Sequence, residues 1–145
     1  METTHFYEVT VNWVADRKGA MRSPVLDTII EVATPPQFPK GMKGIWSPEH
    51  LFVAAVNSCL MTTFLAFAEN SHLAFESFSS KASGKLEIVD GKYMISEITL
   101  MPVLTITEKT NEEKAKRLLS KLENNCLISN SIKSKIIFEP EVKIA

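Results

Sequence analysis

The sequence has no excess of charge of one sign and very little cysteine. Its 145 residues carry 16 Lys plus Arg against 17 Asp plus Glu. Such a chain has no overall field to attract nucleic acid or an anionic membrane, so we expect partners to be recognised locally and nucleic acid not to bind. Two cysteines are too few for a disulfide-rich secreted scaffold and indicate free or redox-active thiols.

Other absences exclude further kinds of site. The first residues show no signal-peptide pattern, so we expect a cytoplasmic protein. Glycine occurs only five times, with no phosphate-binding glycine loop and no Gly-x-Ser-x-Gly elbow. The three histidines show no ligand spacing with the cysteines, so we expect no metal and no bound cofactor.

The composition that remains, 45% hydrophobic and 23% charged, is typical of a globular protein, and one domain over residues 1–145 is the simplest expectation. Its most prominent segment predicts a helix from Pro48 to about Asn70. Ser47 is a suitable N-cap, Pro48 suits the first helical position, and Glu49 places a carboxylate where the helix dipole favours it.

This helix is apolar from residue 51 to 68, which raises the question of a membrane span. Polar residues interrupt the run near its centre, and its surroundings look like soluble sheet, so we expect no membrane insertion. A helix that is apolar all round needs cover on every side. One sheet provides too little, and a homodimer that wraps two sheets around two central helices would provide the rest.

Alternating and turn-rich segments predict the strands and loops around this helix. Strands are expected over residues 5–13, 20–23 and 27–33, a loop over 34–45, and a hairpin of 75–89 and 93–104 turning at 90–91. Pro102 is expected to end its strand or to mark an edge. A final strand is expected over 135–144, with Pro140 at a bulge or edge.

A second helix is predicted by the capping-box pattern from Thr110 to Glu113. Its apolar face carries Ala115, Leu118, Leu119 and Leu122. Its basic residues, from Lys109 to Lys121, are interpreted as a solvated face rather than a nucleic-acid patch. The order of strands, helix, hairpin, helix and strand favours an α+β fold with an antiparallel sheet.

Cys59 lies in the middle of the long helix, and Cys126 follows the second helix on its apolar face. Each cysteine alone is consistent with a small buried hydrophobe. Together they allow a reactive pair in which one sulfur attacks and the other resolves, and the residues leave both interpretations open.

Each cysteine lies in a recognisable segment. The segment with Cys59 is residues 47–59, Ser-Pro-Glu-His-Leu-Phe-Val-Ala-Ala-Val-Asn-Ser-Cys, and the segment with Cys126 is residues 126–132, Cys-Leu-Ile-Ser-Asn-Ser-Ile. The first resembles the Pro-Glu-x-Leu segment and Ala-x-x-x-Cys helix of the OsmC/Ohr family of thiol peroxidases, OsmC-like branch. The second is similar to that family's Cys-Pro-Val-Ser-Asn-Ala-Leu motif, with Leu127 where proline is common.

The resemblance implies antiparallel sheets wrapped around long central helices in an intertwined homodimer. It implies a peroxidase that reduces organic hydroperoxides, and hydrogen peroxide as a further substrate. Cys59 would form a sulfenic acid and Cys126 would resolve it as a disulfide. Arg17, with Arg22 as the alternative, and Glu49 would stabilise the thiolate. No bound cofactor is implied; an external dithiol, with a lipoylated protein as one candidate, would supply electrons.

Glu49 and Cys59 are ten residues apart on one predicted helix, which corresponds to about 15 Å along its axis. They therefore cannot touch within one chain, and we expect the acid and the arginine to come from the partner subunit. Two other functions stay open, a non-catalytic small-ligand binder on the same scaffold and a hot-dog-like thioesterase, because one fold can host several functions.

Overall fold

The computed structural model describes residues 3–145, which form two compact units that divide between Leu51 and Phe52. The expectation of one domain over the whole chain stays a prediction, as does the homodimer.

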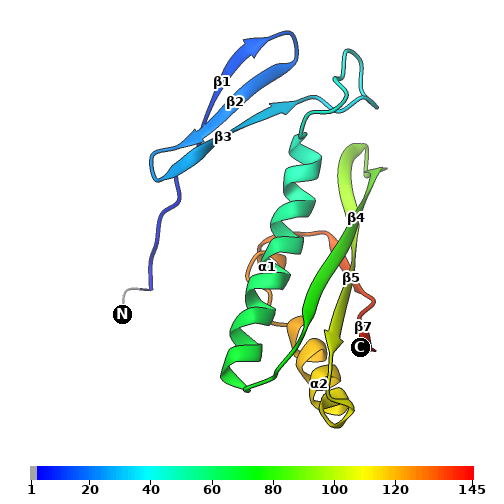
Figure 1. The fold of residues 1–145 in the computed structure, drawn as a ribbon. Helices are drawn as coiled ribbons and strands as arrows, with labels where there is room; N and C mark the ends of the chain where they lie inside the picture. The colour runs from blue at the N-terminus through cyan, green and yellow to red at the C-terminus, as the bar shows by residue number, and fades with distance from the viewer. Residues whose placement is uncertain (1–2) are drawn as a thin grey trace. The chain divides into compact units, whose positions relative to one another are not determined.

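The first unit contains a three-stranded antiparallel sheet, shown in blue in Figure 1. Its strands, in the order β1-β2-β3, are β1 (Thr10–Ala15), β2 (Lys18–Ser23) and β3 (Leu26–Ala33). This confirms the predicted meander, but the first strand begins later than expected. Thr10 pairs with Arg22 and β2 ends one residue further on, so residues 5–9 have no partner strand in this unit. The prediction of a half-buried first strand is also wrong, because all of β1 is exposed.

The proline-rich segment after β3 forms the predicted loop, which returns to that strand at its end. The Ala33 amide donates a hydrogen bond to the Trp46 carbonyl at 2.8 Å. A Cβ atom on Gly41 would lie 2.0 Å from the Pro35 carbonyl oxygen, so the loop folds back too closely for any larger residue.

The long helix α1 spans Pro48–Asn70, as predicted. The Ser47 hydroxyl oxygen accepts a hydrogen bond from the His50 amide at 3.0 Å, which confirms the N-cap. By length and composition α1 could cross a membrane, a property that core helices of soluble proteins share. Within one chain it is not enclosed on all sides. It buries one stripe, Val56, Leu60, Phe64 and Ala68, and it exposes Phe52, Met61 and Leu65 by 36%, 41% and 43%.

The second unit is built on a long hairpin of β4 (Ser77–Val89) and β5 (Lys92–Ile106). Asp90 and Gly91, with φ of 51° and 79°, form its turn. Two positive φ values are what a two-residue turn between twisted strands requires, which confirms this prediction.

The expected closing strand is two strands, β6 (Lys135–Phe138) and β7 (Glu141–Ile144), separated at Pro140. Both pair with β5 in parallel, so this sheet is mixed rather than purely antiparallel. The parallel direction follows from the helical crossover that joins β5 to β6.

Pro102 lies inside β5 and does not end it, and the other expected alternative, a local edge of the sheet, is what the structure has. The carbonyls of Leu100 and Ile106 accept hydrogen bonds from Glu139 and Ala145, so by alternation the Pro102 nitrogen faces the same side. At that point β6 has ended and β7 has not begun, so no ladder hydrogen bond is lost.

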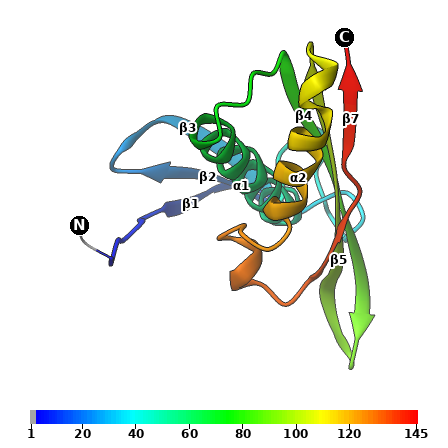
Figure 2. The same ribbon diagram turned by 90° about the horizontal axis from the view of Figure 1, so that it is seen from below.

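The second helix, α2 (Glu112–Leu122), follows a short 3₁₀ turn, η1 (Lys109–Asn111). The predicted capping box is wrong, because Thr110 lies within that turn and the N-cap, Asn111, makes no side-chain capping bond. The predicted apolar face is buried. It packs with the α1 stripe and with alternate residues of β5, Ile98, Leu100, Leu104 and Ile106. Figure 2 shows both helices on the same face of this sheet. The chain is therefore α+β, as predicted.

Candidate functional site

The two cysteines meet on the helix side of the second unit. Cys59 lies at mid-length of α1 and is partly buried, and Cys126 lies in the turn after α2 with only 2% of its surface exposed. The Cys126 thiol donates to the Val56 carbonyl at a sulfur-to-oxygen distance of 3.9 Å. When Cys59 is ionised, the same proton can instead be donated to the Cys59 sulfur. Both cysteines are free thiols. The structure thus brings together the pair whose proximity the sequence left open.

Three further hydrogen-bond donors are directed at the Cys59 sulfur. Two are the backbone amides of Ile128 and Leu127, immediately after Cys126, and the third is the hydroxyl of Thr63, one helical turn further along α1. Successive amides in a turn form a concave site for an anion. Here the anion they suit is a thiolate.

Burial by itself raises the pKa of the Cys59 thiol. The hydrogen bonds from Ile128, Cys126, Thr63 and Leu127 together outweigh that effect, and the pKa lies below its usual value. All of these donors are neutral and belong to residues 52–145. Cys59 is therefore favoured as the nucleophile without the help of a cation from its own unit.

Cys126 has the opposite tendency. Burial raises the pKa of its thiol, and this outweighs the lowering effect of the nearby Ser129; the neighbouring Cys59 raises the pKa further. The environment thus shifts the pKa values of the two thiols apart, that of Cys59 downward and that of Cys126 upward. These are the properties that an attacking thiolate and a resolving thiol require.

The charged residues expected at the site all lie in the first unit. Arg17 is exposed in the turn between β1 and β2, where its carbonyl accepts a hydrogen bond from the Thr34 amide at 3.3 Å. Arg22 is exposed on β2. Glu49 lies in the first turn of α1, and its Oε1 atom is buried without a hydrogen-bond partner among residues 3–145. The approach of these groups to the thiols stays a prediction.

The sequence interpretation missed Thr63 and the two amides. Thr63 had a usable signal, because residues four apart share a helical face. Leu127 had one as well, since proline at that position would have no amide to donate.

Within the described residues, no group of three or more His, Cys, Asp or Glu side chains is placed to hold a metal ion.

The fold and the site define a class of protein, an α+β scaffold in which a thiol on the long helix meets a second thiol in the turn after the next helix. The chain belongs to the OsmC-like protein family, whose model matches residues 41–141. It is 25% identical to the uncharacterised protein YmaD of Bacillus subtilis over 152 aligned residues, covering 99% of this chain and 97% of that protein.

Solved structures share this fold over nearly the whole chain. An OsmC-like protein of unknown function from Vibrio cholerae is 23% identical with a TM-score of 0.83, covering 94% of this chain and 99% of that one. An organic hydroperoxide resistance protein from Elizabethkingia anophelis is 20% identical with a TM-score of 0.77, covering 100% of both chains. An organic hydroperoxide resistance protein from Legionella pneumophila is 20% identical with a TM-score of 0.73, covering 99% and 100%.

Proposed function

We propose that this protein is a cysteine peroxidase that reduces organic hydroperoxides, with hydrogen peroxide as a further substrate. The observation that carries the proposal is the contact between Cys59 and Cys126, in which the pKa of one thiol is lowered and that of the other is raised. A merely structural pair of buried cysteines needs no such difference. The names of the relatives from Elizabethkingia anophelis and Legionella pneumophila support the same function.

The first chemical step is attack of the Cys59 thiolate on the terminal peroxide oxygen. The oxygen–oxygen bond breaks, an S–O bond forms, and the substrate leaves as an alcohol after taking up a proton. Sulfur is oxidised to a sulfenic acid. The amides of Leu127 and Ile128 hold the thiolate before this step.

The second step is attack of the Cys126 sulfur on the Cys59 sulfenic acid. An S–S bond forms, and the hydroxyl leaves as water with the proton that Cys126 gives up. An external dithiol then reduces the disulfide and is itself oxidised. A lipoylated protein is our candidate for that reductant, no bound cofactor is needed, and the cytoplasm is the compartment that would supply dithiols.

We also propose that the active form is a homodimer in which Glu49 and Arg17 act across the interface, with Arg22 as the alternative cation. The exposed apolar residues of α1, Met61 and Leu65 among them, give a surface that a second copy would cover. The unpaired buried Oε1 of Glu49 is a group for which an arginine of the partner would be a suitable donor.

The test is a thiol count and an intact mass before and after one equivalent of cumene hydroperoxide. The wild type should lose both thiols and two hydrogens. Cys126→Ser should stop at an oxidised Cys59, which a sulfenic-acid trap would capture. Cys59→Ser is the matched control and should leave Cys126 reduced.

Two results would overturn the proposal. One is that both thiols stay reduced in the wild type while the peroxide persists. The other is that Cys59→Ser consumes the peroxide as fast as the wild type.

A further inference from the structure

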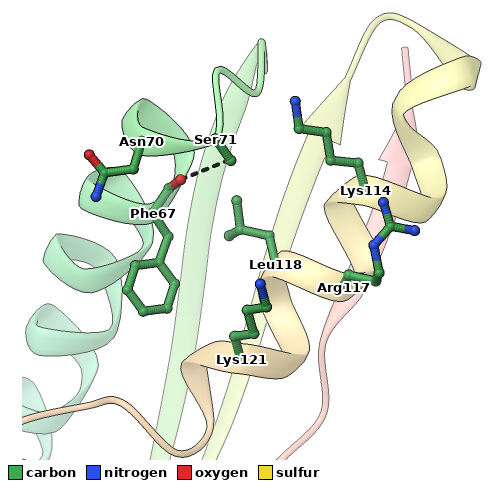
Figure 3. Close-up of a pocket in the computed structure, with 7 residues that line it drawn as sticks. All are labelled: Phe67, Asn70, Ser71, Lys114, Arg117, Leu118 and Lys121. Carbon is green, nitrogen blue, oxygen red and sulfur yellow. Dashed lines mark hydrogen bonds between the residues drawn. The ribbon is translucent and has the colours of Figure 1, made fainter.

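A pocket of about 420 Å³ lies at the far end of the second unit, between the last turn of α1 and the exposed side of α2. Its volume is within the usual range for small-molecule sites. Figure 3 shows the residues that line it, which are Phe67, Asn70, Ser71, Lys114, Arg117, Leu118 and Lys121. Three of these seven are cations, and no carboxylate is among them.

The lining is divided into an apolar and a charged part. Phe67 on α1 and Leu118 on α2 form the apolar part, and both pack with the hydrophobic core. Lys114, Arg117 and Lys121 follow one another along α2 at spacings of three and four, which places them on one side of that helix. Figure 3 shows the ammonium group of Lys121 next to Leu118, and the Lys114 side chain extending to the side on which Ser71 lies.

These three cations have no ion-pair partner among residues 3–145. The salt bridge of α2 instead joins Lys116 and Glu112, at 3.8 Å. The last turn of α1 does not need the cations either. Its carbonyls at 67, 68 and 69 accept hydrogen bonds from the amides of Ser71, Leu73 and His72, and the Ser71 hydroxyl donates to the Phe67 carbonyl at 2.8 Å. The C-terminal end of α1 is therefore already capped by the residues that directly follow it.

We infer that this pocket binds a small organic anion with an apolar body, a carboxylate or a phosphomonoester. The charged head would lie among Lys114, Arg117 and Lys121, and the apolar body would lie on Phe67 and Leu118. Three uncompensated cations beside an apolar floor suit such a ligand better than they suit a nucleic acid, because a pocket of about 420 Å³ has room for one small group and the whole chain has no positive excess. This site is separate from the thiol pair and does not depend on the peroxidase proposal.

Isothermal titration calorimetry with decanoate, octyl phosphate, inorganic phosphate and neutral decanol tests this inference. Decanoate or octyl phosphate should bind at one site per chain, more weakly as salt is raised. The variant Lys114→Gln/Arg117→Gln/Lys121→Gln should bind at least tenfold more weakly. Lys116→Gln is the matched control, because it removes an equal type of charge from the same helix outside the pocket, and it should bind like the wild type.

The variant Phe67→Leu tests the contribution of the apolar body of the ligand separately from that of its charged head. It should weaken decanoate binding severalfold and leave inorganic phosphate unchanged. Circular dichroism shows whether each variant is folded, and a variant that has lost its fold is replaced by the single change Lys121→Gln. Equal binding of decanol and decanoate, or equal binding by the triple variant and the wild type, would overturn the inference. So would the absence of measurable binding of every anion to the wild type.

Discussion

Replacing Thr63 by valine removes one hydrogen bond to the Cys59 sulfur and changes the side-chain volume little. A hydrogen bond to a charged group contributes about 1.5–3 kcal/mol. Because Cys59 is only partly buried, solvent screening favours the lower end of that range. Since 1.36 kcal/mol corresponds to a factor of ten in an ionisation equilibrium, we expect the pKa of Cys59 to rise and its thiolate fraction at low pH to fall about tenfold.

A higher pKa has two opposite effects on the rate at which Cys59 reacts as a nucleophile. Below both pKa values the thiolate fraction falls about tenfold, while each thiolate becomes about threefold more nucleophilic, because reactivity rises with basicity with an exponent of about 0.4–0.5. The variant should therefore react about threefold more slowly at low pH. Above both pKa values every Cys59 is ionised, and the variant should react about threefold faster. The two pH profiles should cross.

The assay is the rate of reaction with a neutral dipyridyl disulfide as a function of pH. It is done in the Cys126→Ser background, where only one thiol reacts and a hydroxyl remains as donor. Thr62→Val is the matched control, since the Thr62 hydroxyl donates to the Cys59 carbonyl at 3.1 Å and not to its sulfur. Profiles of Thr63→Val that coincide with those of Thr62→Val would refute the proposed anion site.

Three further predictions concern other parts of the second unit. Leu127→Pro removes the weakest of the donors to Cys59, so a pH titration should show the pKa rising by less than in Thr63→Val; a fall would contradict this. Gly84→Ala places a Cβ 2.6 Å from Val53 Cγ2 and should lower the free energy of unfolding by about 1–3 kcal/mol in urea, with partial rescue by Val53→Ala; strict additivity would contradict the clash. Leu65→Glu puts a charge on the exposed apolar side of α1, and light scattering should show a monomer without peroxidase activity; an active monomer would refute the shared site.

The sequence predicted elements whose determinants are local. The bounds of α1 follow from Ser47 and Pro48 at one end and a polar exit at the other, and the hairpin turn follows from Asp90-Gly91. The parallel pairing of β6 and β7 was not predicted, because strand direction depends on where the α2 crossover returns the chain and on no residue within the strands.

The two cysteines of the candidate site could be predicted from the sequence, but the hydrogen-bond donors around Cys59 could not. Motif spacing identified Cys59 and Cys126. The amide donors of residues 127 and 128 depend on the turn conformation after Cys126, for which the only sequence signal was the absence of proline at position 127. The Thr110 capping box failed for a related reason, since a 3₁₀ turn took the place of the expected helix start.

The two cysteines lie in segments with very different secondary structure. Cys59 is held by a continuous helix, whereas residues 123–134 around Cys126 contain no regular element except the 3₁₀ turn η2 (Ser129–Ser131). In the proposed oxidised form, a covalent bond to α1 would tether that irregular segment. Its amides should then exchange with solvent more slowly, and proteases should cut it less readily, than in the reduced protein. The redox state of the protein would thus be readable as the local stability of this one segment.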